Sequence, residues 1–183
     1  MKKWMYVVIG VVVVVGVVLA VRFAPERSPV ENGIPDGGNG VPDNGVPDNG
    51  VPDIATATSL QFSVEWANDE TGELTYRGKD MGTEDMKLRC EGTLDGVEEG
   101  FIINGELRKI WSLQDGVWRD EGIEDEYWDT FWDMFVTPFE AYAAELYDWT
   151  HGDWTYTDPY TGYSVTIYNI QVNPNLSDAL FAP

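Results

Sequence analysis

Hydrophobic positions follow three successive patterns along the chain. The first is an almost unbroken apolar run, Trp4–Phe23, which has about the length that a helix needs to cross a bilayer. A polar stretch rich in Gly, Pro and Asp follows, and from Leu60 onward apolar residues alternate with polar ones or recur every three or four residues. This order predicts a membrane segment, a linker and a folded domain, with boundaries at 1–24, 25–54 and 55–183.

The apolar run begins just after Lys2 and Lys3, and the acidic chain beyond it favours an exported carboxyl side. We therefore expect a single-pass protein of the cell membrane whose C-terminal domain lies outside the cytoplasm. A cleaved signal peptide is the alternative, because Val18-Leu19-Ala20 offers small residues to a peptidase. Either interpretation exports the domain.

The linker repeats the unit Val-Pro-Asp-Asn-Gly, as in GVPDNGVPDNGVPD at residues 40–53. Proline fixes φ and glycine permits positive φ, so the repeat predicts a semi-flexible, disordered stalk that lifts the domain off the membrane. Oxygen ligands suit calcium, but the aspartates and asparagines of the repeat match the spacing of no calcium-binding loop. We therefore expect no metal site there.

The domain opens with predicted β-strands. Alternation of apolar and polar residues indicates three strands with one buried face, Leu60–Trp66, Glu73–Lys79 and Met86–Glu91. Phe101–Ile103 runs into Asn104-Gly105, which predicts a two-residue hairpin, and Leu107–Leu113 should return antiparallel. Asp115-Gly116 should then turn the chain into Val117-Trp118-Arg119. Five or six consecutive strands should form a meander, and two more are expected later, at Trp154–Thr157 and Tyr163–Val172.

The segment between these two groups of strands has helical spacing. Five aromatic residues recur at intervals of three and four positions: Tyr127, Trp128, Phe131, Trp132 and Phe135. Thr137 can cap a second helix, with Pro138 at its first position and Glu140 completing a capping box. Two helices in tandem, bent at Thr137, should lie across the sheet. The predicted class is α+β, with a curved antiparallel sheet wrapped around a helical insertion.

Charge excludes one class of partner. The chain has a net charge of −21, and residues 54–183 hold seven basic residues against twenty-six acidic ones, a net charge of −19. Nucleic acid is therefore not an expected partner, because its binding rests on basic contacts to phosphate. The acidity fits solubility in a salty or crowded exterior, and a dedicated cationic partner is the alternative. Cys90 is the chain's only cysteine, so no internal disulfide can form, and its alternating context predicts a small core residue.

Catalytic patterns are weak. His151 is the only histidine, and no nucleophile motif accompanies it and Asp153. A set of acidic residues falls near the predicted helix start, where acids interact favourably with the helix dipole: Glu121, Glu124, Asp125, Glu126 and Asp129. We expect no enzymatic activity, no catalytic residue and no cofactor. Asn175-Leu176-Ser177 is a glycosylation sequon, which makes Asn175 a candidate modification site on an exported surface.

Several segments resemble the half-barrel superfamily of the lipoprotein carriers LolA and LolB, and especially its membrane-anchored archaeal surface relatives. The resemblance rests on five stretches: LQFSVEW at Leu60–Trp66, MKLRCEG at Met86–Gly92, FIINGELRKIWSLQDGVWRD at Phe101–Asp120, YDWTHGDWTYTD at Tyr147–Asp158 and VTIYNIQVNPNLSDALF at Val165–Phe181. It implies a half-barrel sheet that encloses helices and an apolar cavity able to hold acyl chains. Unlike the free carriers, this domain is expected to be tethered, through Trp4–Phe23.

The resemblance implies a binding function. The expected ligand is a lipid, a lipid-modified protein or another apolar molecule, and the candidate cavity lining is aromatic: Phe62, Trp66, Tyr76, Trp111, Trp118, Trp128, Phe131, Trp132 and Phe135. Aromatic residues at helical spacing against a sheet also make an ordinary packed core. The alternative is therefore a non-enzymatic structural or protein-interaction module of the cell surface, with a surface-layer or other cell-surface protein as its partner.

Overall fold

The computed structural model describes residues 53–67, 71–159 and 161–183, and the chain from Pro52 onward forms one compact unit. The expected membrane segment Trp4–Phe23 and the repeat stalk lie outside the described residues. Within the described ranges, no helix is both long and apolar enough to cross a membrane.

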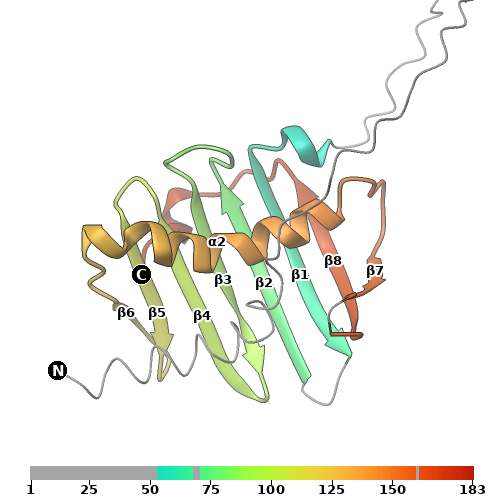
Figure 1. Cartoon of the computed structure of the whole chain (residues 1–183), viewed down its shortest axis with the longest axis horizontal. Helices are drawn as coiled ribbons and strands as arrows, with labels where there is room; N and C mark the ends of the chain where they lie inside the picture. The colour runs from blue at the N-terminus through green and yellow to red at the C-terminus, as the bar shows by residue number, and fades with distance from the viewer. Residues whose placement is uncertain (1–52, 68–70, 160) are drawn as a thin grey trace, which may run out of the picture. The chain divides into compact units, whose positions relative to one another are not determined.

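The described residues form one open antiparallel sheet of eight strands (Figure 1). The strands are β1 (Ser59–Ala67), β2 (Thr71–Lys79), β3 (Lys87–Leu94), β4 (Val97–Asn104), β5 (Lys109–Gln114), β6 (Val117–Asp120), β7 (Trp154–Thr157) and β8 (Ser164–Val172). Their order across the sheet is β6-β5-β4-β3-β2-β1-β8-β7. The meander predicted from the alternating pattern is confirmed for β1 to β6, and with it the α+β class.

The helix α2, Trp128–Glu145, crosses one face of this sheet (Figure 1). We call the face that α2 covers the helix face and the opposite one the back face. Consecutive residues of β4 show the alternation, because Phe101 and Ile103 pack in the core under α2 whereas Ile102 packs in a second cluster on the back face. Both faces of the sheet therefore carry buried apolar residues.

The expectation of two helices bent at Thr137 is wrong. A short 3-10 helix, η2 (Asp125–Tyr127), leads into α2, and α2 then runs without interruption through Pro138. A proline inside a helix costs about 3 kcal/mol through a lost hydrogen bond and a steric clash. Its neighbour Phe139 is fully buried. Burying a side chain of this size contributes about 3 kcal/mol, which offsets the cost of the proline.

The turn at Asn104-Gly105 also differs from the expected two-residue hairpin. Asn104 is the last paired residue of β4, opposite Lys109, and the connection is the longer loop Gly105–Arg108. The Asn104 side-chain oxygen accepts a hydrogen bond of 3.1 Å from the Leu107 N–H and so shapes this loop. The predicted Asp115-Gly116 turn is confirmed, with φ of 53° and 72°.

A two-residue turn that the sequence analysis did not identify joins β3 to β4. Asp95 and Gly96 have φ of 50° and 79°, and they connect the paired residues Leu94 and Val97. Glycine adopts positive φ at no steric cost and aspartate tolerates it, so Asp-Gly is a strong signal for this turn type.

The C-terminal segment, Asn173–Pro183, lies against the back face and includes the 3-10 helix η3 (Asp178–Phe181). Leu176 and Phe181 pack against Ile102 and Trp111 in the second apolar cluster. Arg89 donates a hydrogen bond of 3.0 Å to the carbonyl oxygen of Leu180 and stacks over the Trp118 ring, with 5.0 Å between the guanidinium carbon and the ring centroid. The end of the chain therefore closes the second core.

Candidate functional site

Four aromatic rings fill the centre of the helix face: Phe62, Tyr76, Phe139 and Tyr142. Phe62 stacks on Phe139 with 5.5 Å between ring centroids, and its centroid lies 5.4 Å from that of Tyr76. All four side chains are buried, none exposing more than 4 % of its surface. Aromatic pairs of this geometry stabilise a core beyond their buried area. The described side chains therefore occupy the space between the middle of the sheet and α2.

Cys90 belongs to the same interior, next to Tyr76 on the neighbouring strand. Burial raises the pKa of the Cys90 thiol and of the Tyr76 hydroxyl well above their usual values. A thiol reacts as its thiolate, so Cys90 is inert while the domain is folded. This confirms the prediction of a small core residue.

The nine candidate lining residues fall into three groups. Phe62, Tyr76 and Trp128 are buried in the helix-face core. A second group is partly exposed at the border of that core: Trp66, Phe131, Trp132 and Phe135. Trp111 and Trp118 belong to the cluster on the back face, behind the sheet. The structure therefore brings seven of the nine to one face and separates the other two from them.

Two adjacent rows of mostly apolar residues run across the helix face from β7 to β4. They lie near the strand ends that hold Trp66 of β1 and Leu94 of β3. Cross-strand pairing places six residues in the first row, Tyr156, Val165, Trp66, Gly72, Leu94 and Val97. It places six more in the second row, Trp154, Ile167, Val64, Leu74, Gly92 and Glu99. We call these twelve residues the apolar rows. Trp66 and Leu94 meet above Gly72, where a Cβ atom would lie 2.5 Å from a Leu94 methyl group and 3.1 Å from the Trp66 ring.

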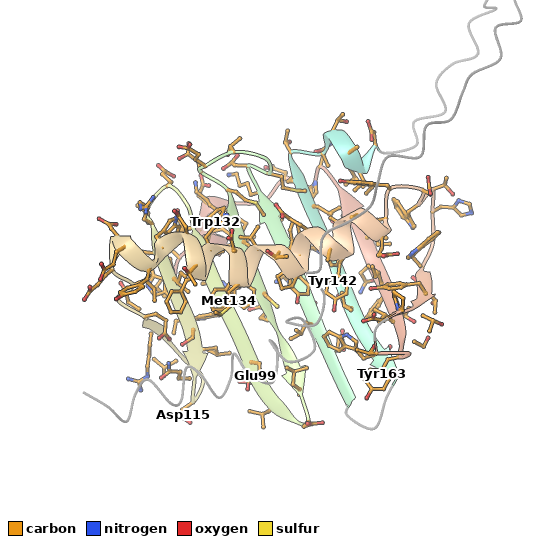
Figure 2. All side chains as sticks on the ribbon, in the orientation of Figure 1. Glu99, Asp115, Trp132, Met134, Tyr142 and Tyr163 are labelled. Carbon is orange, nitrogen blue, oxygen red and sulfur yellow. The ribbon has the colours of Figure 1, made fainter. Side chains whose placement is uncertain are left out.

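The apolar rows border the flank of α2. Phe135 of the helix packs on Phe101 of β4, with 4.6 Å between ring centroids. Figure 2 shows Met134 on the same side of α2 as Glu99, with Trp132 on the opposite side. Met134 and Val97 leave 37 % and 58 % of their surfaces exposed. Apolar side chains that solvent can reach therefore stand both on the helix flank and at the end of the rows.

Two polar groups in the second row lack partners within the described residues. Glu99 is the only charged side chain of the apolar rows, no described cation pairs with it, and burial raises the pKa of its carboxyl group. At the other end of the row, the Trp154 Nε1–H is shielded from solvent and has no hydrogen-bond acceptor. Leaving the shielded Trp154 N–H unpaired costs free energy, and the partly buried Glu99 carboxylate would be stabilised by a cation that pairs with it.

Basic side chains gather on the other face of the sheet. Arg77 and Arg89 lie opposite each other on the back faces of β2 and β3, and Glu91 accepts a hydrogen bond of 2.7 Å from each. The helix α2 contains four acidic residues and no basic one, and the apolar rows contain no basic residue either. The apolar rows and α2 together are therefore negatively charged, and the basic Arg119 lies on the helix face farther away, on β6.

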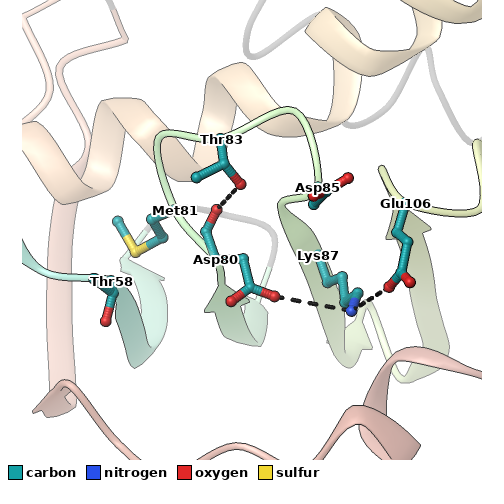
Figure 3. Close-up of a pocket in the computed structure, with 7 residues that line it drawn as sticks. All are labelled: Thr58, Asp80, Met81, Thr83, Asp85, Lys87 and Glu106. Carbon is teal, nitrogen blue, oxygen red and sulfur yellow. Dashed lines mark hydrogen bonds and ion pairs between the residues drawn. The ribbon is translucent and has the colours of Figure 1, made fainter.

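A separate polar pocket of about 430 Å³ lies at the loop that joins β2 to β3 (Figure 3). Seven residues line it: Thr58, Asp80, Met81, Thr83, Asp85, Lys87 and Glu106. The Lys87 ammonium lies 2.8 Å from Glu106 and 3.8 Å from Asp80. The hydrogen bond to Glu106 raises the pKa of Lys87. Because carboxylates already neutralise this lysine, it is poorly suited to binding an anionic ligand.

The weaker candidates lie apart from these features. His151 is exposed and its Nδ1 lies 2.9 Å from the Thr150 hydroxyl. Glu121 accepts hydrogen bonds from Ser112 and Gln114, whereas Asp125 and Asp129 occupy first helical turns. The described residues contain no group of three or more His, Cys, Asp or Glu side chains placed to hold a metal ion. Asn175, the glycosylation candidate, is exposed on the C-terminal segment.

Comparison of the chain with protein-family models, with curated proteins and with solved structures finds no match. The resemblance to lipoprotein carriers therefore stays a prediction. The function has to be argued from the packing, charge and exposure of the described residues.

Proposed function

We propose that the domain is a non-enzymatic interaction module, exported and held at the cell membrane by Trp4–Phe23, with the repeat as its stalk. One observation carries the proposal: the interior between the centre of the sheet and α2 is filled by Phe62, Tyr76, Phe139 and Tyr142. A filled interior leaves binding to the surface of the domain. The partner is another protein of the cell surface or of a surface layer.

The charge distribution supports an exported surface role. The domain carries a net charge of −19, which keeps it soluble by self-repulsion and repels anionic lipid head groups. Apolar side chains lie side by side in the rows beside α2, whereas the exposed Leu107, Val117 and Tyr147 stand in other parts of the domain. Contiguous apolar surface of this kind is typical of a contact site. The module would therefore bind its partner through one face while the rest of it stays hydrated.

A second candidate function is the binding of a lipid or a lipid-modified protein by a half-barrel related to the lipoprotein carriers. The partly exposed aromatic residues favour it, because Trp66, Phe131 and Phe135 border the core without being enclosed by it. An acyl chain gains about 0.8 kcal/mol per buried CH₂ group, so even a shallow apolar site could hold one. If the domain has this second function, the apolar rows hold the ligand in place of an enclosed cavity.

Native mass spectrometry separates the two candidates. The full chain is purified from its own membranes in a mild detergent and measured before and after organic extraction. The interaction module predicts the bare protein mass in both spectra and no adduct after phospholipids are added back. An extractable adduct of lipid mass would overturn it in favour of the second candidate.

A further inference from the structure

The apolar rows combine two properties that a protein contact site needs. They are contiguous across six strands, from β7 to β4, because each residue pairs with the next through the sheet register. Large side chains stand at their partly exposed positions, among them Trp66, Leu94 and Trp154. Aromatic anchors of this kind dominate binding energy at protein interfaces.

Charge identifies the kind of partner. Glu99 ends the second row among apolar residues, and no basic side chain of the described residues pairs with it. The flanking helix α2 contributes four more acidic residues and no basic one. The four basic residues of β2 and β3 are engaged on the back face by Glu91, Asp178 and Glu106. An approaching cation would therefore meet acidic groups beside the apolar rows and α2, and already neutralised groups on the back faces of β2 and β3. A negatively charged surface selects a positively charged partner and steers its approach.

The unpaired Trp154 indole adds a hydrogen-bonding requirement at the opposite end of the same row. Its N–H group needs an acceptor, and a peptide backbone supplies carbonyl oxygens along its whole length. Lipid tails supply none. A peptide segment therefore supplies a basic side chain for Glu99, and one of its carbonyl groups pairs with the Trp154 N–H once the side chains that shield that group move apart.

We propose that the apolar rows bind a cationic amphipathic segment of a partner protein, with apolar side chains packed between Trp66 and Leu94 and a lysine or arginine paired with Glu99. This inference rests on the proposed interaction module and specifies its contact surface. The partner segment presents one apolar side and basic residues at its edges.

The test uses the full chain in nanodiscs of zwitterionic phosphatidylcholine, with empty nanodiscs as the blank. Three labelled peptides are titrated and followed by fluorescence anisotropy: an amphipathic Leu/Lys peptide, a scrambled peptide of the same composition, and the corresponding Leu/Glu peptide. We expect the amphipathic cationic peptide to bind tightest, and raising the salt concentration to weaken it because exposed charges are screened.

Variants locate the site. Glu99→Gln should weaken binding of the amphipathic cationic peptide about fivefold, the loss expected for one partly exposed ion pair. Glu98→Gln is the matched control, since the adjacent residue points to the back face and carries the same charge. Leu94→Asp should weaken binding by at least about tenfold, because it places a charge in the centre of the apolar surface. Thermal melts monitored by circular dichroism establish that each variant is folded.

Two results would overturn the inference. Equal losses for Glu98→Gln and Glu99→Gln would show attraction to the net charge alone. Absence of peptide binding to the full chain would also overturn it. If binding then appeared only after proteolytic removal of residues 1–53, the ligand of the apolar rows would be the N-terminal part of the chain itself. Failure of peptide binding without any lipid adduct in the native mass spectrum would leave the interaction module standing with another contact surface.

Discussion

Lys79 on β2 and Lys87 on β3 lie directly opposite each other, and one carboxylate of the C-terminal segment bridges them. Asp178 accepts a hydrogen bond of 2.7 Å from the Lys79 ammonium and one of 3.3 Å from that of Lys87. Like charges that face each other across antiparallel strands are destabilising. The C-terminal segment therefore relieves a repulsion within the sheet as well as covering its back face.

Asp178→Asn is expected to lower the melting temperature near neutral pH, because it removes this bridge. The hydrogen bond from Lys79, followed by that from Lys87, lowers the pKa of Asp178. Its stabilising effect is therefore present above the unfolded aspartate pKa of about 3.9 and is lost as the pH falls through the lower folded value. Melts at low and high salt check the assignment, since about 1 M salt should shrink the difference from wild type. The same shift with Glu98→Gln would contradict it.

Glu99→Gln is expected to raise the melting temperature at pH 7. Burial raises the pKa of Glu99, so its ionised form is disfavoured in the folded state. The resulting destabilisation is present above the folded pKa and disappears below the unfolded glutamate pKa of about 4.3. Paired melts of the variant and the wild type at pH 7 and near pH 3.5 measure this. A variant no more stable than wild type at pH 7 would show that burial does not disfavour the ionised form of Glu99.

Gly78→Ala is expected to destabilise the domain by about 1–3 kcal/mol through overpacking. A Cβ atom at Gly78 would lie 2.6 Å from the Phe139 ring, which is fully buried. In the double variant Gly78→Ala/Phe139→Leu, the leucine is smaller than the phenylalanine it replaces and leaves room for the new methyl group. The double variant should therefore lose less stability than the sum of the losses of the two single variants. Urea denaturation of the four proteins gives the coupling free energy. Strict additivity would mean that the two residues do not touch.

Phe181→Ala is expected to cost about 3–5 kcal/mol of stability, the range for truncating a buried phenylalanine. Phe181 is fully buried on the back face beside Ile102 and Trp111. Deletion of the exposed Ala182 and Pro183 is the matched control and should change stability little. Urea denaturation compares the two variants. Equal stabilities would mean that the segment does not close the second core.

Cys90 is expected to resist thiol reagents in the folded protein. Its side chain exposes 1 % of its surface, and burial raises the pKa of the thiol. Iodoacetamide at pH 8 should therefore modify the native chain slowly and the urea-unfolded chain fast, as read from intact mass. Because this is the only cysteine in the chain, the signal is unambiguous. Rapid modification of the native protein would place Cys90 at the surface.

The strands were predictable because a sheet with one buried face imposes a period of two on the sequence. Leu60–Trp66 and Glu73–Lys79 show that period and form β1 and β2. The Asp115-Gly116 turn was predictable for a local reason as well, since two residues at positive φ need this chemistry. Asp95-Gly96 carries the same signal and could have been identified from it.

Where local and tertiary preferences compete, the sequence prediction was wrong. Pro138 is typical of the start of a new helix, yet α2 passes through it because the burial of Phe139 over Gly78 offsets the cost of the proline. Asn104-Gly105 reads as a tight hairpin, yet the Asn104 amide donates a hydrogen bond of 3.3 Å to the carbonyl oxygen of Phe181, far along the chain. Partners this distant in sequence leave no local pattern.

The sequence by itself determined the class of the domain, its strands and its acidity, because periodicity and charge are local or additive properties. Only the tertiary structure decided which aromatic residues share a face. Trp66 and Trp111 read alike in the sequence, yet strand pairing puts Trp66 in the apolar rows and Trp111 behind the sheet under Phe181. The placement of Glu99 beside apolar neighbours depends on the same register. A site is made by residues that pairing brings together, and pairing is a property of the folded chain.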